Sequence, residues 1–176
     1  TAAAVMALRE RLPEMPIIGV EPGIKPAVSA TRSGRIAVLA TTSTAHSERL
    51  AKLIEKYASS VTVDILPCPG WATRVEAFDL TGGNFIEEAR ERLQNTLANG
   101  SDQIVLGCTH YSFLAPALRS IIGSKATLVD VSEAIARQSS KLARPSTNEQ
   151  GHLKLLSTAN PERLQQALGV FGLDNL

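Results

Sequence analysis

The sequence predicts an α/β fold, with a mainly parallel sheet and helices on both faces. Short apolar runs alternate about six times with helical segments along the 176 residues, which is typical of parallel sheets with crossover helices. Some of these runs, such as 35–40 (RIAVLA), are continuously apolar, as strands covered on both faces are. Loops with functional residues are therefore expected at the carboxyl ends of the strands.

The first half of the chain begins with a helical pattern. Val5, Leu8 and Leu12 recur at helical spacing, which predicts a helix over 2–12. Between residues 47 and 57 an apolar stripe with charged residues outside it predicts an amphipathic helix. The other elements expected here are a strand at 16–20 (PIIGV), a short helix at 25–32, and strands at 35–40 and 61–66.

The second half repeats the alternation. Asn84 with Glu87 three residues later predicts a capped helix start, and Asn99-Gly100 predicts its end. Asn160 before Pro161 predicts another capped helix. The elements expected here are helices at 84–97, 115–122, 132–142 and 161–170, strands at 103–106, 126–129 and 152–156, and a surface loop at 144–151.

Composition excludes several classes of function. The chain has 18 basic and 17 acidic side chains and few aromatic residues (4%), so it lacks the basic face and stacking rings of a nucleic-acid binder. No apolar stretch approaches the roughly 18 residues of a membrane span, and Arg9 to Arg11 interrupt the early apolar run that a signal peptide would need. Two cysteines without a secretory signal are expected to be thiols, so we expect a cytoplasmic protein.

Cys108 is the strongest candidate for chemistry. It follows an apolar strand and Gly107 and precedes a helix, so backbone N–H groups are available to stabilise a thiolate. His110, two residues later, can exchange a proton with the thiol or with a ligand. The alternative is a small cysteine that packs at a strand end, and spacing by itself leaves both interpretations open.

Two other loops at predicted strand ends carry candidate residues. Thr41 and Thr44 follow the strand at 35–40, where hydroxyls and free N–H groups can hold a carboxylate, although an N-cap is the favoured interpretation of Thr44 from the residues themselves. Glu76 can orient or charge a neighbouring histidine, or be a solvated side chain. Cys68, between two prolines, is expected to pack rather than react, and His46 and His152 are expected at the surface or at caps.

Several common chemistries lack their residues here. The sequence contains no G-x-G-x-x-G, G-x-x-x-x-G-K-[ST], G-x-S-x-G or C-x-x-C motif. A single C-x-H, with the other cysteine 40 positions away, does not supply a zinc ligand set, so no metal is expected.

Four segments, in order, resemble those of the glutamate racemases, cofactor-independent enzymes of the aspartate/glutamate racemase superfamily. They are 19–27 (GVEPGIKPA), 36–47 (IAVLATTSTAHS), Cys68-Pro69 followed by Glu76, and 106–111 (LGCTHY). Similar segments also fall at 129–130 and at 157–161. The resemblance spans the whole chain, and Gly-Cys-Thr-His-Tyr after a strand is its most specific part.

The resemblance implies racemisation of glutamate at Cα, for peptidoglycan precursor supply, by two thiols and without a cofactor. Cys108 would be one thiol, assisted by His110 and Glu76. Thr41, Thr44 and Thr109 would bind the substrate. Glutamate is thus the expected partner, with no nucleic acid and no membrane, and a homodimer is carried as a further hypothesis.

The sequence also departs from the family pattern. Family members carry an earlier Asp-Ser-Gly loop and a first catalytic cysteine in a Cys-Asn-Thr motif, and Cys68 does not match that motif. Ser43 stands where Gly is usual, and Ser112 where Pro is usual. We therefore expect a chain that lacks the N-terminal part of the family and is inactive by itself. Its expected organisation is one complete doubly wound lobe over 17–129, with pieces of a second lobe at 1–16 and 130–176.

Two alternatives to glutamate racemisation stay open. One is a related racemase or decarboxylase acting on aspartate or another amino acid. The other is a catalytically inactive module that keeps a carboxylate-binding pocket.

Overall fold

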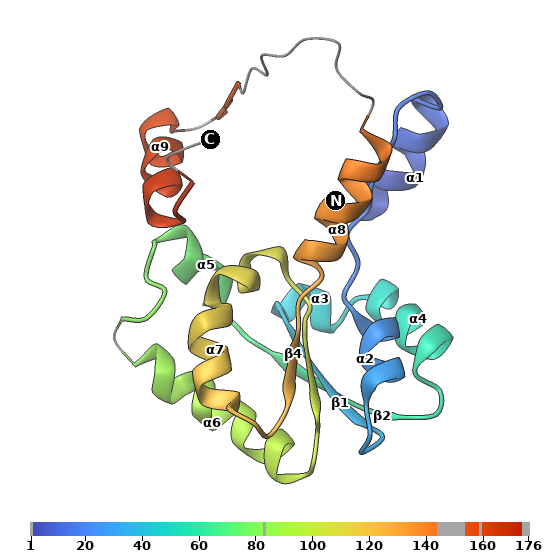
Figure 1. The fold of residues 1–176 in the computed structure, drawn as a ribbon, viewed down its shortest axis with the longest axis vertical. Helices are drawn as coiled ribbons and strands as arrows, with labels where there is room; N and C mark the ends of the chain where they lie inside the picture. The colour runs from blue at the N-terminus through green and yellow to red at the C-terminus, as the bar shows by residue number, and fades with distance from the viewer. Residues whose placement is uncertain (1, 83, 144–153, 159, 174–176) are drawn as a thin grey trace. The chain divides into compact units, whose positions relative to one another are not determined.

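The computed structural model describes residues 2–82, 84–143, 154–158 and 160–173 (Figure 1). The elements in chain order are α1 (Ala2–Arg11), α2 (Ile24–Ala30), β1 (Arg35–Ala40), α3 (Thr42–Ala45), α4 (Glu48–Tyr57), β2 (Thr62–Pro67), α5 (Trp71–Glu76), α6 (Phe85–Ala98), β3 (Gln103–Leu106), the 3₁₀ helix η1 (Thr109–Leu114), α7 (Ala115–Ile122), β4 (Thr127–Val129), α8 (Ser132–Leu142) and α9 (Pro161–Val170).

The strands form a four-stranded sheet in the order β2-β1-β3-β4, and every neighbouring pair is parallel. Leu39 of β1 lies opposite Leu66 of β2 and Leu106 of β3. The chain therefore leaves β1 toward one edge of the sheet and later returns to build β3 and β4 on the other side. This arrangement confirms the predicted α/β fold with a parallel sheet.

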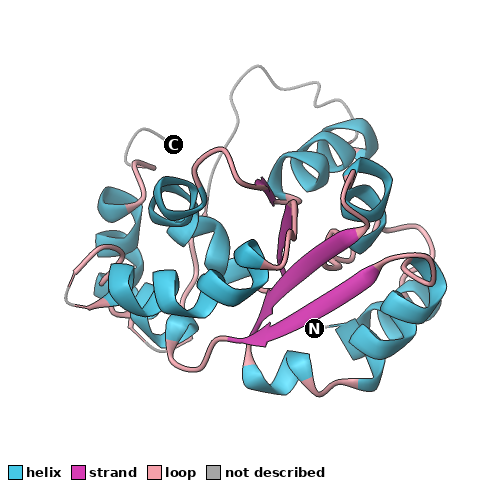
Figure 2. Ribbon diagram, turned by 90° about the horizontal axis from the view of Figure 1, so that it is seen from below, coloured by secondary structure: helices cyan, strands magenta, loops and turns pink. Residues whose placement is uncertain are grey.

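Helices cover both faces of the sheet (Figure 2). On one face Ile36, Val38 and Ala40 pack with Ile24 of α2 and Leu50 of α4 in a single buried cluster. Because strand side chains alternate between faces, the intervening residues of β1 point to the other side, where α6 and α7 lie against each other (Figure 1). Both faces of β1 are thus buried, which explains its continuous apolar run.

Most predicted elements are confirmed. Five predicted elements have the observed boundaries: the strands at 35–40 and 103–106 and the helices at 115–122, 132–142 and 161–170. Six others differ by one or two residues at an end: the helices at 2–12, 25–32, 47–57 and 84–97 and the strands at 61–66 and 126–129. Asn160 caps α9 as expected, accepting a hydrogen bond from the Arg163 N–H. Asn84 precedes α6, but its side chain makes no capping bond.

The predicted strand at 16–20 is wrong. These residues form no strand, and Val20 is 42% exposed. Pro16 has no N–H to donate to a sheet ladder, and the Ile17 carbonyl instead accepts a hydrogen bond from the Arg9 guanidinium. The apolar run therefore links α1 to α2 as an irregular segment.

Two further predictions, a loop after β2 and a strand at 152–156, differ from the structure in the residues that it describes. Part of the loop expected to carry Cys68 and Glu76 is the helix α5 (Trp71–Glu76). Of the predicted strand at 152–156, only Lys154–Leu156 lie within the described residues, and they are irregular and exposed. The predicted loop at 144–151 and His152 lie outside the described residues.

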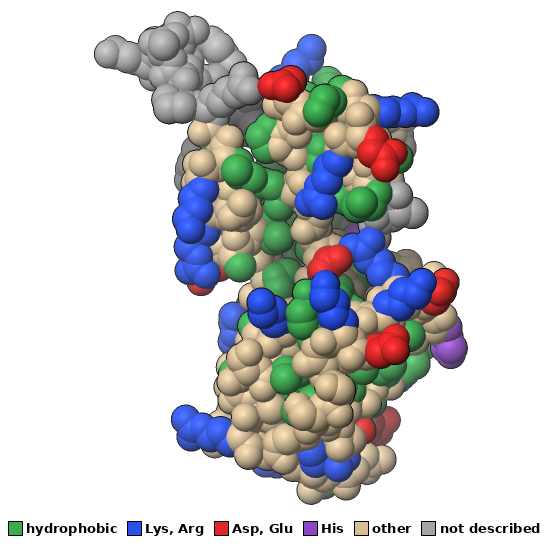
Figure 3. Space-filling model, turned by 90° about the vertical axis from the view of Figure 1, so that its right-hand side faces the viewer, with side chains coloured by type: hydrophobic (Ala, Val, Ile, Leu, Met, Phe, Trp, Pro, Cys, Tyr) green, Lys and Arg blue, Asp and Glu red, His purple; other side chains and the backbone are tan. Residues whose placement is uncertain are grey.

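The chain divides into two compact units, Thr1–Leu142 and Ala143–Leu176. The first contains the sheet and its helices, and the second contains α9. The division into lobes at 17–129, 1–16 and 130–176 stays a prediction. No described helix has the length and apolar character that crossing a membrane requires. On the face in Figure 3, basic and acidic side chains are interspersed.

Candidate functional site

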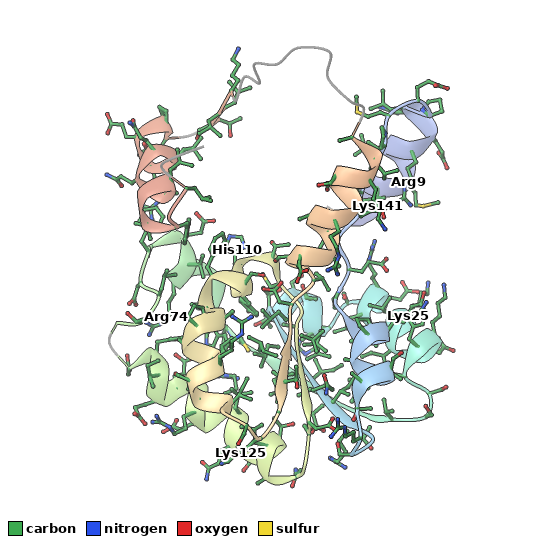
Figure 4. All side chains as sticks on the ribbon, in the orientation of Figure 1. Arg9, Lys25, Arg74, His110, Lys125 and Lys141 are labelled. Carbon is green, nitrogen blue, oxygen red and sulfur yellow. The ribbon has the colours of Figure 1, made fainter. Side chains whose placement is uncertain are left out.

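The candidate residues lie at the carboxyl edge of the sheet, where β1 lies between β2 and β3. In doubly wound sheets ligands bind at the carboxyl ends of two neighbouring central strands from which the chain leaves in opposite directions. Here these strands are β1, from which the chain continues to β2, and β3, from which it continues to β4. His110 lies at this edge, whereas Lys125, which precedes β4, lies at the opposite edge (Figure 4). The loops after β1, β2 and β3 therefore share one edge.

Gly107 brings the loops after β1 and β3 together. Its N–H donates to the Leu39 carbonyl at 2.7 Å. A Cβ atom at this position would lie 2.7 Å from the same carbonyl oxygen. Because that separation is too short for a side chain, glycine permits the close approach that places Cys108 beside the end of β1.

The structure brings Cys108 and His110 together. Cys108 is extended and is the residue before η1, and the tight 3₁₀ turn that follows returns the His110 ring toward it. The Cys108 Sγ and His110 Nδ1 atoms are 3.8 Å apart, within reach of a sulfur hydrogen bond. Cys108 is a partly exposed free thiol, so the packing alternative does not describe its environment.

Glu76 lies on the other side of the same imidazole. Its Oε1 atom is 2.7 Å from His110 Nε2. An ionised carboxylate only accepts hydrogen bonds, so Nε2 carries the proton in this contact, and Nδ1 of the neutral ring faces the thiol as an acceptor. The side chains of His110 and Glu76 are 35% and 66% exposed. The three groups form a thiol, base and carboxylate series open to solvent.

Cys68 has a different environment. It is 1% exposed, and its Sγ–H donates to the Leu66 carbonyl at 3.3 Å. Burial raises the pKa of this thiol to about 12, despite the opposing charge of Arg92. Cys68 is thus a packing residue, as the sequence predicts.

Thr41 and Thr44 contact each other after β1. The Thr41 Oγ1 hydroxyl donates to Thr44 Oγ1 at 2.9 Å and accepts from the Thr44 N–H at 3.2 Å. The capping prediction for Thr44 is therefore wrong: Thr41 caps α3, and Ser47 caps α4. Since Thr41 donates its hydroxyl proton to Thr44, the Thr44 hydroxyl proton is available to another acceptor.

The remaining candidates make fewer contacts. Thr109 follows Cys108 and is exposed. His46, predicted at the surface or at a cap, is exposed and ends α3 with its Nδ1 2.8 Å from the Thr42 carbonyl oxygen. In the described parts of the chain, no three His, Cys, Asp or Glu side chains gather as a metal-ion site would require.

A buried aromatic brace, formed by Trp71, Phe85 and Tyr111, connects the elements that carry the site. The Trp71 ring makes edge contacts with Phe85 at 5.1 Å and with Tyr111 at 5.6 Å between ring centroids. Trp71 begins α5, which ends with Glu76, and Tyr111 follows His110 directly. The brace therefore holds Glu76 and His110 on elements packed against each other.

Both polar ends of the brace are hydrogen-bonded. Trp71 Nε1 donates to Glu88 Oε1 at 2.9 Å, and the Tyr111 hydroxyl donates to the Cys68 carbonyl at 3.1 Å. These bonds fix the rings to α6 and to the end of β2. No role for these rings is predicted from the sequence, although Trp71 and Val75, four residues apart and both buried, have the spacing of one helix face.

A second polar contact fixes η1 from the β4 side. Asp130 Oδ1 accepts hydrogen bonds from the Ser132 N–H and hydroxyl at 2.9 and 2.7 Å, and from the Ser112 hydroxyl at 3.1 Å. Ser112, which stands where the racemases usually have proline, thus ties η1 to the start of α8.

Comparisons with known proteins agree with the resemblance. The family described as Asp/Glu/Hydantoin racemase matches residues 1–139. A glutamate racemase of Pseudomonas aeruginosa is 39% identical over 174 residues, covering 97% of this chain and 66% of that protein. One of Pseudomonas syringae pv. tomato is 45% identical over 142 residues, covering 81% of this chain and 52% of that protein. The chain thus spans two thirds or less of the length of these curated relatives.

Solved structures show the same fold. Escherichia coli glutamate racemase, in complex with L-glutamate and the activator UDP-MurNAc-ala, aligns with a TM-score of 0.81 and 27% identity, covering 99% of this chain and 68% of that one. Glutamate racemase isoform RacE1 of Bacillus anthracis aligns with a TM-score of 0.61 and 27% identity, covering 80% and 54%.

Proposed function

The chain belongs to the Asp/Glu/Hydantoin racemase family, and on that premise we propose that it carries the Cys108 half of a glutamate racemase site. The named relatives in the comparisons are glutamate racemases, which favours glutamate as the substrate. The observation that carries the proposal is the connected series of Cys108, His110 and Glu76.

This series suits proton transfer at a carbon atom. Inversion at Cα without a cofactor needs a base on one face of the carbon and an acid on the other. His110 Nδ1 accepts the Cys108 proton, and Glu76 stabilises the imidazolium that forms, so a thiolate becomes available to remove the Cα proton. When Cys108 instead begins as the thiol, it donates its proton to the carbanion that forms after the second thiol, as thiolate, removes the Cα proton of the opposite enantiomer.

The hydroxyls at the same edge suit the charged groups of glutamate. Thr44 accepts from Thr41 and keeps its own hydroxyl proton available to donate, and Thr109 is exposed next to Cys108. We assign Thr41 to orient Thr44, and Thr44 and Thr109 to donate hydrogen bonds to the substrate. Hydroxyl donors are uncharged, so they hold a substrate by hydrogen bonds and add no charge to the site.

Cys68 is not the second thiol of this mechanism. Its sulfur is buried and its proton is held by the Leu66 carbonyl, so it neither reaches a substrate nor ionises near neutral pH. In this proposal the chain supplies one of two thiols, and the isolated 176-residue chain does not racemise glutamate.

A chimera tests the proposal. This chain is joined to the part of the Pseudomonas aeruginosa relative that it does not span, and Cα-proton exchange is followed by NMR in heavy water with L- and D-glutamate. We expect exchange and inversion with both enantiomers. Cys108→Ser should abolish inversion, whereas Cys68→Ala should preserve it. Undiminished inversion in the Cys108→Ser chimera would refute the assigned role.

The same assay separates the alternatives. The family description includes aspartate and hydantoin substrates, so a panel of these compounds identifies a related racemase. Tight glutamate binding without exchange identifies an inactive binding module. Supply of D-glutamate to peptidoglycan precursors, a cytoplasmic location and a homodimer stay predictions, and light scattering of the purified protein checks the last of these.

A further inference from the structure

Cys108, His110 and Glu76 also form the arrangement of nucleophile, base and orienting carboxylate used in covalent acyl transfer. We propose that this chain has a second activity, the hydrolysis of activated esters and thioesters through an acyl thioester on Cys108. This activity goes beyond racemisation, because it uses one thiol rather than two.

The ring geometry of His110 supports a nucleophilic role for Cys108. Nε2 is held by Glu76 at 2.7 Å, which fixes the tautomer and leaves Nδ1 as the acceptor facing Sγ at 3.8 Å. Thiol–imidazole contacts of this length occur before a substrate binds and tighten in the complex. The three groups are therefore ordered as covalent catalysis requires, with the carboxylate acting on the base and the base acting on the sulfur.

Exposure of the site supports the hydrolytic half of the cycle. Cys108 is partly exposed, and the side chains of His110 and Glu76 are 35% and 66% exposed. Hydrolysis of an acyl thioester consumes water. Among the residues that the structure describes, Cys108, His110 and Glu76 are thus open to the water that the second activity consumes.

The reaction balances with the groups present. The Cys108 sulfur attacks the acyl carbon while its proton passes to His110 Nδ1. The carbon–oxygen or carbon–sulfur bond to the leaving group breaks, and the leaving group takes the proton from His110. Water then attacks the thioester as His110 removes its proton, and the Cys108 sulfur departs and is reprotonated. The products are one acid and one alcohol or thiol.

The substrate class follows from which groups the site supplies. The site supplies a nucleophile, a base and an orienting carboxylate, which together activate the attack on the acyl carbon. Acyl donors whose leaving groups are weak bases suit it, because such groups depart readily after the attack. Aryl esters and small acyl thioesters are donors of this kind, and amides are not.

The test uses the 176-residue chain with p-nitrophenyl acetate. Stopped-flow absorbance follows release of p-nitrophenolate, and mass spectrometry of peptides locates the acetyl group. We expect a burst of about one equivalent followed by steady turnover, with the acetyl group on Cys108. Acetyl coenzyme A with a thiol-detecting dye tests the thioester arm.

Variants assign the steps. Cys108→Ala should remove both the burst and the turnover. His110→Asn should slow acylation roughly 100-fold or more and leave the acetyl group on Cys108, because deacylation loses its base. Glu76→Gln should cause a smaller loss, since the amide oxygen still accepts from Nε2. His46→Asn and Cys68→Ala are the matched controls and should behave as wild type, and fluorescence of the single tryptophan, Trp71, checks folding.

Alkylation provides a test without substitution. Iodoacetamide on the native chain should block Cys108, leave the buried Cys68, and remove the activity. A burst without turnover would show that Cys108 is only a reactive thiol and would overturn the proposal. So would turnover that persists in Cys108→Ala, or acetyl groups found only on lysines. None of these results bears on the chimera assay, so failure of the second activity and failure of racemisation are separately observed.

Discussion

At the residue scale, environment separates two identical side chains. Cys108 and Cys68 both follow parallel strands, yet one has an imidazole neighbour and partial exposure and the other is buried with its proton donated to a carbonyl. A thiol reacts as the thiolate, so exposure and a neighbouring base determine its reactivity.

This contrast gives a direct prediction for the native chain. Iodoacetamide near neutral pH should alkylate Cys108 and leave Cys68 unmodified until the chain is unfolded, because burial raises the pKa of Cys68 to about 12. Peptide mass spectrometry after timed quenching measures both sites in one sample. Equal alkylation of the two thiols in folded protein would contradict the assignment.

Gly107→Ala tests the close approach of β3 to β1. The new Cβ atom would lie 2.7 Å from the Leu39 carbonyl oxygen, in backbone that both strands hold in place. We expect a loss of about 1–3 kcal/mol in the free energy of unfolding, as for other overpacked sites, measured by urea denaturation.

Gly34→Ala is the comparison for that substitution. Gly34 has a φ of +71° and no atom within 4 Å of its Cβ position, so only backbone strain opposes a side chain there. The expected cost is about 1–2 kcal/mol. If Gly107→Ala leaves stability unchanged while Gly34→Ala lowers it, β1 and β3 separate more easily than the structure indicates.

At the element scale, α5 and η1 act as a pair. Each carries one residue of the candidate series, Glu76 on α5 and His110 on η1, and the aromatic brace packs between them. The position of the carboxylate relative to the imidazole thus depends on contacts made by buried rings, not only on the two functional side chains.

Tyr111→Phe should therefore disturb the site as well as the fold. It removes the hydrogen bond to the buried Cys68 carbonyl, and we expect a loss of about 1 kcal/mol in stability. We also expect a weaker or faster-exchanging NMR signal from the His110 Nε2 proton, because η1 is less firmly held against α5.

Tyr57→Phe is the matched control. Tyr57 ends α4 and contacts Lys25 and Lys56 through its ring face, which phenylalanine retains. Its stability should stay within about 0.5 kcal/mol of wild type. A Tyr111→Phe protein that is less stable yet has an unchanged His110 proton signal would show that the brace stabilises the fold without positioning the site.

At the scale of the whole molecule, two protonated groups in the buried core make the fold less stable at alkaline pH. Burial raises the pKa of Cys68 from 9.0 to about 12, and burial also raises the pKa of Tyr111. The folded chain thus retains protons that the unfolded chain releases. The contribution of these two groups to the free energy of unfolding is fully present below their pKa in the unfolded chain. It falls as the pH rises toward their pKa in the folded chain.

We expect the Cys68 contribution to fall by about 1.4 kcal/mol for each pH unit above pH 9. Cys68→Ala should flatten the pH profile of unfolding free energy between pH 8 and about pH 10.5, relative to wild type. Thermal or urea unfolding across that range measures the difference. Parallel profiles for the two proteins would rule out a buried, protonated Cys68.

The sequence predicts most of this architecture because its signals are local. Continuous apolar runs mark β1 and β3, an amphipathic stripe marks α4, and a capping residue marks the start of α9. The prediction is wrong at 16–20, where an apolar run has the composition of a strand but no partner strand. Pairing is a property of the assembled sheet, so composition by itself does not decide it.

Sequence by itself determined the alternation of helices and strands between residues 24 and 142, the placement of the candidate loops at strand ends, and the identity of Cys108 as the leading candidate. The tertiary structure decided that Glu76, 34 residues from His110, lies 2.7 Å from its ring, and that buried Trp71 and Tyr111 hold the two together. Local spacing limits which residues meet within a helix or loop, whereas contacts between distant segments depend on how the sheet and its helices pack.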